Sequence, residues 1–203
     1  MLHAITECLV IKLKLFKLNK LFELMEKECI IVNSLNTFNE KKFEQVLHYI
    51  ISKKGSLDNV GKTVLYKMLY FSDFDFYEIN EESITGELYY KLPNGPAPKH
   101  FDIAIKHLEK EKKIKISDGS FFGKKQMKFS STTEPCLNLL NGDEIKVIDK
   151  AINKLGEMNA NQISSYSHED MPWKATKEKN IINYELVFYR NPIFSVRNED
   201  VAC

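Results

Sequence analysis

The amino-acid sequence predicts an α+β fold: a mostly helical single domain with a small antiparallel β-hairpin or sheet. Two observations indicate this class. Apolar residues recur at the 3.6-residue spacing of amphipathic helices, most clearly over residues 61–78 and 143–155. Residues 114–130 instead contain two alternating segments that flank Asp118-Gly119 and Gly123, as the strands of a hairpin do. With 43% hydrophobic residues among 203, the chain has enough apolar material for a core.

The first predicted helix starts after Asn39, whose side chain can accept hydrogen bonds from the free N–H groups of a first turn. Phe43, Leu47 and Ile50 follow at helical spacing and predict its buried side. We expect Gly55 to follow the last turn, a position that commonly favours glycine.

The second predicted helix, residues 61–78, is apolar on nearly all sides. Such a helix is either central to the core or covered by a partner. Tyrosine suits both settings, because a buried hydroxyl finds a hydrogen-bond partner and interfaces favour the same amphipathic ring. Core packing and partner binding therefore both stay open. One face consists of Leu65, Met68, Leu69, Ser72 and Phe76, and a second stripe consists of Tyr66, Tyr70, Phe74 and Tyr77, with Asp73 beside it.

A turn is predicted at residues 80–83 and a strand at 84–92. The next segment, PNGPAP at 93–98, contains three prolines, which lack the N–H and fix φ. We therefore expect it to lie outside any regular ladder, with Pro98 in the first turn of the next helix. That helix carries Phe101, Ala104, Ile105 and Leu108 on one side.

The rest of the chain adds the hairpin at 114–130, the helix at 143–155, a short helix from Ala160 to Ser167, and a strand around Glu185–Tyr189. No repeat or linker divides these elements. We therefore expect one domain over residues 37–195, with an N-terminal extension at 1–36 and a C-terminal tail at 196–203.

The N-terminal extension contains an apolar run at residues 9–24 that is interrupted by lysines. It falls short of the roughly 20 uninterrupted apolar residues that span a bilayer, and no cleavage site of small residues follows it. A membrane span and a signal peptide are therefore not expected. Two interpretations stay open: a basic helix that lies at an interface, or translated upstream sequence with the true start at Met25.

Composition narrows the possible functions. The 29 basic residues against 28 acidic ones give a formal charge of +1, so no overall basic field favours nucleic acid. The four cysteines are scattered and do not have the short spacings of metal ligands. We expect reduced thiols in the cytoplasm, and neither a metal nor a cofactor.

The predicted hairpin allows a second functional class. A helix followed by a hairpin, as at 99–130, also describes a winged-helix module, in which Lys124, Lys125 and Lys128 would contact phosphates. The preceding helix carries no Arg or Asn cluster suited to base edges. A DNA-binding regulator of its own operon is therefore the alternative.

No set of residues predicts an enzyme. His168-Glu169-Asp170 has neither a nucleophile beside it nor a histidine at metal-ligand spacing. We expect His168 to make a hydrogen bond and to pack beside Trp173, which would fix the loop before the last strand. Asp73 and Asp75 are two apart on a helix, so they point in different directions and cannot readily share a proton or a metal.

Three segments, in this order, are typical of a known family: KTVLYKMLYFSDFDFYE at 62–78, SITGELYYKLPNGPAP at 83–98 and SHEDMPW at 167–173. Their order and separations resemble the Panacea domain, also called the SocA-like antitoxin domain, of bacterial and phage toxin–antitoxin pairs. The resemblance runs from about residue 38 to about 194. The family's frequent Leu-Leu-Tyr-Phe run is Met-Leu-Tyr-Phe here. Structural motif positions are Gly86, Tyr90, His168 and Trp173.

The resemblance implies an antitoxin that is encoded beside a toxin and neutralises it by direct protein–protein contact. Our hypothesis is that the chain occludes its toxin through the aromatic stripe and the loop at 93–98. Delivery of the toxin to a protease by an adaptor is a second mechanism, which the sequence does not separate from the first. The candidate toxin-binding residues are Tyr66, Tyr70, Asp73, Phe74, Tyr77, Asn94, Gly95 and Pro96.

Overall fold

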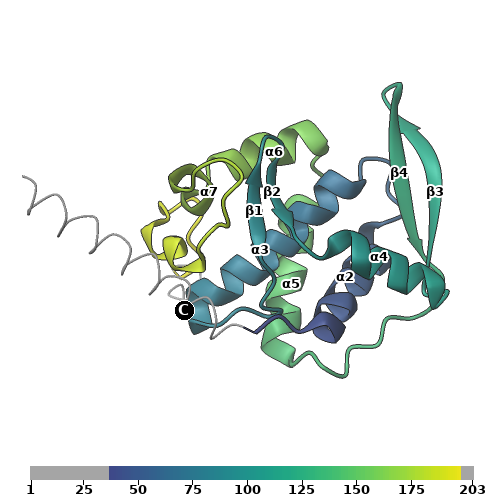
Figure 1. Ribbon diagram of the computed structural model, residues 1–203, viewed down its shortest axis with the longest axis horizontal. Coiled ribbons are helices and arrows are strands. Elements are labelled where there is room, and N and C mark those ends of the chain that lie inside the picture. The colour runs from purple at the N-terminus through teal and green to yellow at the C-terminus, as the bar shows by residue number, and fades with distance from the viewer. Residues whose placement is uncertain (1–36, 198–203) are drawn as a thin grey trace, which may run out of the picture. The chain divides into compact units, whose positions relative to one another are not determined.

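The computed structural model describes residues 37–197 (Figure 1). The predictions for residues 1–36, including the alternative start at Met25, and for the end of the tail at 198–203 lie outside the described residues. None of the helices between residues 37 and 197 combines the length and the apolar character needed to cross a bilayer. The helices are α2 (Glu40–Lys54), α3 (Lys62–Asn80), α4 (Phe101–Lys110), α5 (Gly142–Leu155), α6 (Ala160–His168), α7 (Met171–Ala175) and the 3₁₀ helix η1 (Tyr184–Tyr189). The strands are β1 (Tyr89–Leu92), β2 (Gly95–Pro98), β3 (Ile114–Phe121) and β4 (Lys124–Ser131).

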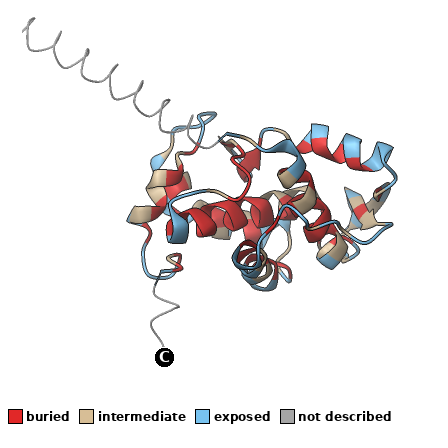
Figure 2. Cartoon of the chain, turned by 90° about the horizontal axis from the view of Figure 1, so that it is seen from below, coloured by how far each residue is buried: buried red, intermediate tan, exposed pale blue. Residues whose placement is uncertain are grey.

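Helices dominate, and the strands form two small antiparallel sheets, β1–β2 and β3–β4. The predicted α+β class is therefore confirmed. Helix α3 is the centre: from Val64 to Glu78, every residue except Tyr66 is buried. Helices α2, α5 and α6, strand β2 and η1 all contact it. Figure 2 shows the buried residues concentrated in the central helices and the exposed ones in the loops and on the outer faces of helices.

Asparagine caps start three of the α-helices of the described chain. At α2 the side chain of Asn39 accepts a hydrogen bond from the N–H of Lys42 at 3.0 Å, as predicted. At α5 and α6, Asn141 and Asn159 each form a capping box with the residue three positions later. Such caps satisfy N–H groups that a helix start leaves free, and each stabilises by about 1 kcal/mol.

The first sheet corrects the prediction for residues 84–98. Strand β1 is shorter than expected, and Gly95–Pro98 is its antiparallel partner rather than a segment outside the ladder. Pro96 pairs with Lys91, whose own N–H points away from β2 and donates to the carbonyl of Asn180 at 2.9 Å. Successive residues of a strand direct their N–H groups to opposite sides. Prolines spaced two apart therefore remove no donor from this ladder.

Pro98 ends β2 and does not lie in the first turn of a helix, which corrects that prediction. Helix α4 begins at Phe101 after His100. Its buried side is the predicted one, with Phe101, Ala104, Ile105 and Leu108.

Residues 184–189 form a 3₁₀ helix, so the strand predicted around Glu185–Tyr189 is wrong. The pairing with β1 stops at Ile181 and Ile182, and no strand continues beside the residues that follow in the described chain. Their N–H groups are satisfied locally instead, because backbone groups that leave a ladder need other partners. The buried residues Tyr184, Val187 and Arg190 recur at the three-residue period of this helix.

Strands β3 and β4 form the predicted hairpin over residues 114–131. The turn lies at Phe122-Gly123, because Phe121 pairs with Lys124, and Asp118-Gly119 lies inside β3. Both turn residues have positive φ, +47° and +74°. Two-residue turns with positive φ match the twist of the flanking strands.

Gly55 does follow α2, but for a reason that the sequence did not indicate. Its φ is −60°, so it is right-handed and helical. A Cβ atom there would lie 2.4 Å from the carbonyl oxygen of Phe129 on β4 and 2.6 Å from that of Ile51. The missing side chain lets the end of α2 approach the hairpin.

We expect Gly55→Ala to lower the free energy of unfolding by about 1–3 kcal/mol, because two backbone oxygens would have to move away from the new methyl group. Gly142→Ala at the start of α5 is the matched control, since a Cβ there meets nothing within 4 Å. The control should change stability by less than about 0.5 kcal/mol. Urea unfolding measures both, and equal effects would contradict the close approach.

Candidate functional site

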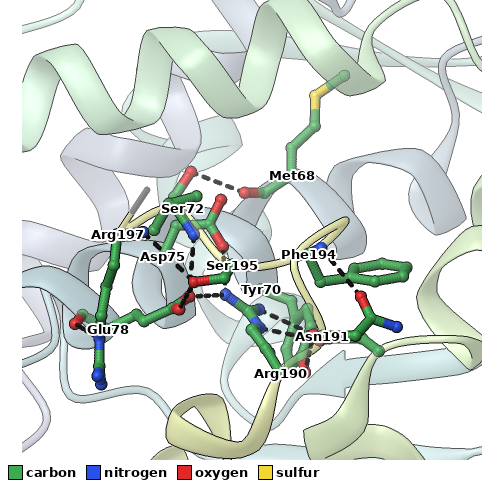
Figure 3. A network of polar contacts seen from close by, with 12 residues as sticks. Met68, Tyr70, Ser72, Asp75, Glu78, Arg190, Asn191, Phe194, Ser195 and Arg197 are labelled. Carbon is green, nitrogen blue, oxygen red and sulfur yellow. Dashed lines mark hydrogen bonds and ion pairs between the residues drawn. The ribbon is translucent and has the colours of Figure 1, made fainter. Parts of the chain in front are cut away.

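A buried cluster of charges joins α3 to the C-terminal part of the described chain (Figure 3). The guanidinium of Arg190 donates two parallel hydrogen bonds to the carboxylate of Asp170, at 2.9 and 2.8 Å. Its Nη1 also donates to Asp75 at 2.7 Å and to Glu78 at 2.9 Å. Asp75 and Glu78 come from α3, and Asp170 is the residue before α7. One cation therefore holds three carboxylates from two elements.

Burial controls the ionisation of this cluster. Desolvation raises the pKa of Asp75 to about 6, although the charge and hydrogen bond of Arg190 lower it. Burial alone would lower the pKa of Arg190, but the carboxylates of Asp170 and Asp75 raise it well above its usual value. The hydroxyl of Tyr70 donates to Asp170 at 2.9 Å and completes that carboxylate's partners. The cluster is a tightly bonded structural unit.

Glu78 extends the cluster toward the end of the described chain. Its Oε1 accepts a hydrogen bond from the hydroxyl of Ser195 at 2.5 Å, and its backbone carbonyl accepts one from Arg197 at 3.1 Å. The last turn of α3 therefore anchors the segment that follows η1.

Asp73 forms a separate buried unit on another side of α3. Its carboxylate accepts hydrogen bonds from the N–H of Thr85 at 2.9 Å, the hydroxyl of Thr85 at 2.7 Å and the hydroxyl of Tyr89 at 2.7 Å. Burial raises its pKa to about 6, against these hydrogen bonds, which lower it. Asp73 and Asp75 thus have different partners, as their spacing indicated. Asp73 positions the chain that leads into β1.

The aromatic stripe lies in the core. Tyr70 and Phe74 are fully buried and Tyr77 is almost so, whereas Tyr66 is half-buried with its ring edge-on to Phe101 at 4.7 Å between centroids. A partner cannot reach the rings of Tyr70 and Phe74 in this structure. Of the two alternatives that the sequence left open, burial favours core packing for Tyr70 and Phe74, and the ring of Tyr184 in η1 stacks on Phe74.

The turn between β1 and β2 presents one of its predicted residues to solvent. Asn94 is exposed, and its carbonyl accepts a hydrogen bond from Ser164 of α6 at 3.1 Å. Gly95 and Pro96 are buried. Gly95 has a φ of +96°, and a Cβ there would lie 2.4 Å from the hydroxyl oxygen of Ser167. This glycine therefore permits both the turn and its contact with α6.

Of the structural motif positions, Gly86 has a φ of +70° and donates its N–H to Ser83, and Tyr90 pairs with Ile181 across the sheet edge. The rings of His168 and Trp173 stack at 4.0 Å between centroids. The Nε2 of His168 is buried without a hydrogen-bond partner among the described residues, so the predicted hydrogen bond is not seen at that nitrogen.

Lys67 lies in the interior of the protein, with 1% of its surface exposed. Within residues 37–197, no carboxylate pairs with its ammonium group. A Cβ on Gly95 would lie 2.7 Å from its Cε. Desolvation lowers its pKa from 10.5 to about 7, so part of the population is neutral at neutral pH.

The three hairpin lysines do not form one basic face. Lys124 and Lys125 are exposed, but Lys128 folds back and donates to the carbonyls of Leu57 at 3.1 Å and Asp58 at 2.5 Å. Lys128 therefore ties the hairpin to the loop before α3. Within the described residues, no group of three or more His, Cys, Asp or Glu side chains has the geometry of a metal site.

Sequence reasoning missed Arg190 and Lys67. Arg190 follows an apolar and aromatic stretch, and a lone cation in such a stretch is the only signal that could have suggested a buried ion pair. Nothing in the sequence indicated that Lys67 is buried, because a lysine on a helix is usually exposed.

Comparison with protein families gives one match. The model of the family described as antitoxin SocA-like, Panacea domain, matches residues 65–174, more than half of the chain. The matched region runs from α3 to α7 and includes Asp75, Asp170 and the β1–β2 hairpin. No curated protein and no solved structure matches the chain.

We expect Arg190→Met to lower the free energy of unfolding by about 3–5 kcal/mol at pH 8, because it leaves buried carboxylates without their cation. The loss should be smaller at pH 5. Without Arg190 the pKa of Asp75 rises further above its unfolded value, so the folded state takes up a proton as the pH falls.

Arg197→Met is the control, since Arg197 is exposed and donates to a carbonyl rather than to a carboxylate. Its effect should stay below about 1 kcal/mol at either pH. Urea unfolding at both pH values measures the difference, and a pH-independent loss for Arg190→Met would contradict the explanation.

Lys67→Met should be more stable than the wild type at pH 6, and its advantage should shrink by pH 9. The folded pKa of Lys67 lies below the unfolded value, so the wild type gains stability as the pH rises from about 7. Methionine has a similar length and no charge to bury. Lys106→Met on the exposed side of α4 is the control, with no such pH-dependent difference. Unfolding midpoints that keep a constant separation from pH 6 to 9 would disprove the lowered pKa.

Proposed function

The chain belongs to the family of SocA-like antitoxins with a Panacea domain, and from this membership we propose that it neutralises a cognate toxin, encoded next to it, by direct protein–protein binding. The family match over residues 65–174 is the observation that carries the proposal. The proposed activity is binding rather than catalysis, takes place in the cytoplasm and uses no cofactor.

The distribution of exposed side chains supports a binding role. Large apolar side chains reach solvent on turns, helices and strands of the described chain, and Phe122, Tyr189 and Ile193 are the most exposed of them, by 89%, 70% and 74%. Loops on a rigid scaffold are where binding residues concentrate, and exposed aromatic anchors carry much of the energy of protein interfaces. The buried charge clusters around α3 supply the rigid scaffold in this proposal.

The proposed mechanism is stoichiometric occlusion of the toxin. Among the residues proposed from the sequence, Asn94 is the exposed one at the β1–β2 turn and Tyr66 is partly accessible. The buried members, among them Tyr70 and Phe74, would support such a surface from beneath. Delivery of the bound toxin to a protease is compatible with the same first step, since an adaptor also has to bind its cargo.

A DNA-binding regulator of its own operon is the second candidate. The exposed Lys124 and Lys125 on the β3–β4 hairpin favour it. A salt-dependent shift of promoter DNA that is lost when these two lysines are changed to glutamate would support this function.

Co-expression with each adjacent small reading frame tests the antitoxin proposal. We expect one neighbour to arrest growth, and this chain to restore growth and co-purify with that neighbour as a stable complex. Arg190→Met, which we expect to fold poorly, is the control that should not restore growth. Rescue without a complex would indicate transcriptional or proteolytic control, and the absence of any toxic neighbour would refute the antitoxin function.

A further inference from the structure

A pocket of about 470 Å³ lies between the β3–β4 hairpin and the first turns of α3 and α6. Its apolar lining comes from Val64 of α3, from Phe121 and Met127 of the hairpin strands, and from Phe122 in the hairpin turn. In Figure 1 the hairpin projects from the helices beside it, so that its turn stands clear of the core.

Phe122 occupies a backbone conformation that does not suit it. Its φ is +47°, in the left-handed region where a bulky side chain is strained, and asparagine or aspartate is the usual residue at this position of a two-residue turn. Its ring is 89% exposed and lies edge-on to Phe121 at 4.6 Å between centroids. A strained and exposed phenylalanine contributes little to the fold, so its aromatic ring points to a role in binding.

The rim of the pocket is positively charged. Lys62, Lys124 and Lys125 line it, and none of its lining residues is acidic. Lys62 is paired with Asp102 outside the pocket at 2.6 Å, whereas Lys124 and Lys125 are exposed on the hairpin. The pocket therefore complements a segment that carries carboxylates around an apolar side chain.

Helix α6 contacts both the pocket and the β1–β2 turn. Asn161 in the first turn of α6 lines the pocket, and Ser164, three residues later on the same side, donates to the carbonyl of the exposed Asn94. Figure 1 shows the β1–β2 turn against α6. One partner could thus contact the hairpin, α6 and the turn at 94 together.

From this geometry we propose that the pocket is the docking site of the cognate toxin, which inserts an apolar side chain beside Phe122 and places acidic residues next to Lys124 and Lys125. The proposal rests on the antitoxin function proposed above and names the surface through which it acts. Nucleic acid fits the pocket less well, because its lining is largely apolar and Lys128 is turned toward the loop before α3. DNA is therefore treated as an outcome of the test.

The test uses the full chain and the purified toxin identified by the growth assay, in a form disabled for toxicity. Phe122→Asn removes the ring and places a residue that favours positive φ before Gly123. The dissociation constant should rise about ten-fold or more, while the melting temperature stays the same or increases. Ile103→Asn is the matched control, because Ile103 is an exposed apolar side chain of α4 that does not line the pocket.

Lys124→Glu combined with Lys125→Glu should also weaken binding about ten-fold or more, and most strongly at low salt. Lys115→Glu, an exposed lysine of the same hairpin outside the pocket, should leave the dissociation constant within about two-fold of the wild type. Changing the toxin's interfacial carboxylates to lysine should restore binding to the doubly substituted chain.

Each result has a distinct meaning. A wild-type complex that tolerates Phe122→Asn and both glutamates would overturn the docking site but leave the antitoxin function intact. Promoter binding that is lost with the glutamates, while toxin binding is unchanged, would assign the lysines to DNA and also overturn it. If the wild type restores growth without binding the toxin, the proposed function fails, and the docking site with it.

Discussion

The burial of one guanidinium is the constraint on which the rest of the described structure depends. The side chain of Arg190 is fully buried. Hydrogen-bond acceptors must therefore replace the water molecules that the guanidinium loses, and three carboxylates do so. Two of these belong to α3, more than a hundred residues earlier in the chain, and the third, Asp170, starts α7. The central helix, the short α7 and the segment after η1 are therefore held in one arrangement, because any other would leave a buried charge unpaired.

Other buried polar side chains of α3 also fix the segments that pack against the helix. Asp73 holds the residues before β1, Tyr70 reaches Asp170, and Tyr77 donates a hydrogen bond to Glu185 of η1. Burying such polar groups adds little net stability, since desolvation opposes the hydrogen bonds that they form. What they add is specificity, because Tyr70, Asp73 and Tyr77 each form a hydrogen bond with a different neighbouring segment. Aromatic packing supplies the bulk of the buried surface.

This arrangement has a consequence for an antitoxin. In the proposed function, the choice of partner would rest on side chains that the core leaves free, because all the aromatic residues of α3 except Tyr66 are buried. The exposed turns provide them: Phe122 on the β3–β4 hairpin and Asn94 on the β1–β2 hairpin. Substitutions in such turns change a surface without disturbing the buried charges, so the same scaffold can present different residues to different toxins.

By itself the sequence determined the α+β class, the positions of α2, α3, α4, α5 and α6, and the β3–β4 hairpin, because helical periodicity, asparagine caps and alternation are local signals. It also indicated the Panacea family through three short motifs. Only the tertiary structure decided that Gly95–Pro98 is a strand, that residues 184–189 form a 3₁₀ helix instead of a strand, and that Tyr70 and Tyr77 of α3 are core residues. A strand needs a partner with matching donors, and burial depends on which segments cover a face. The burial of Arg190 likewise depends on the tertiary structure, because a cation can be buried only where carboxylates from distant parts of the chain converge on it.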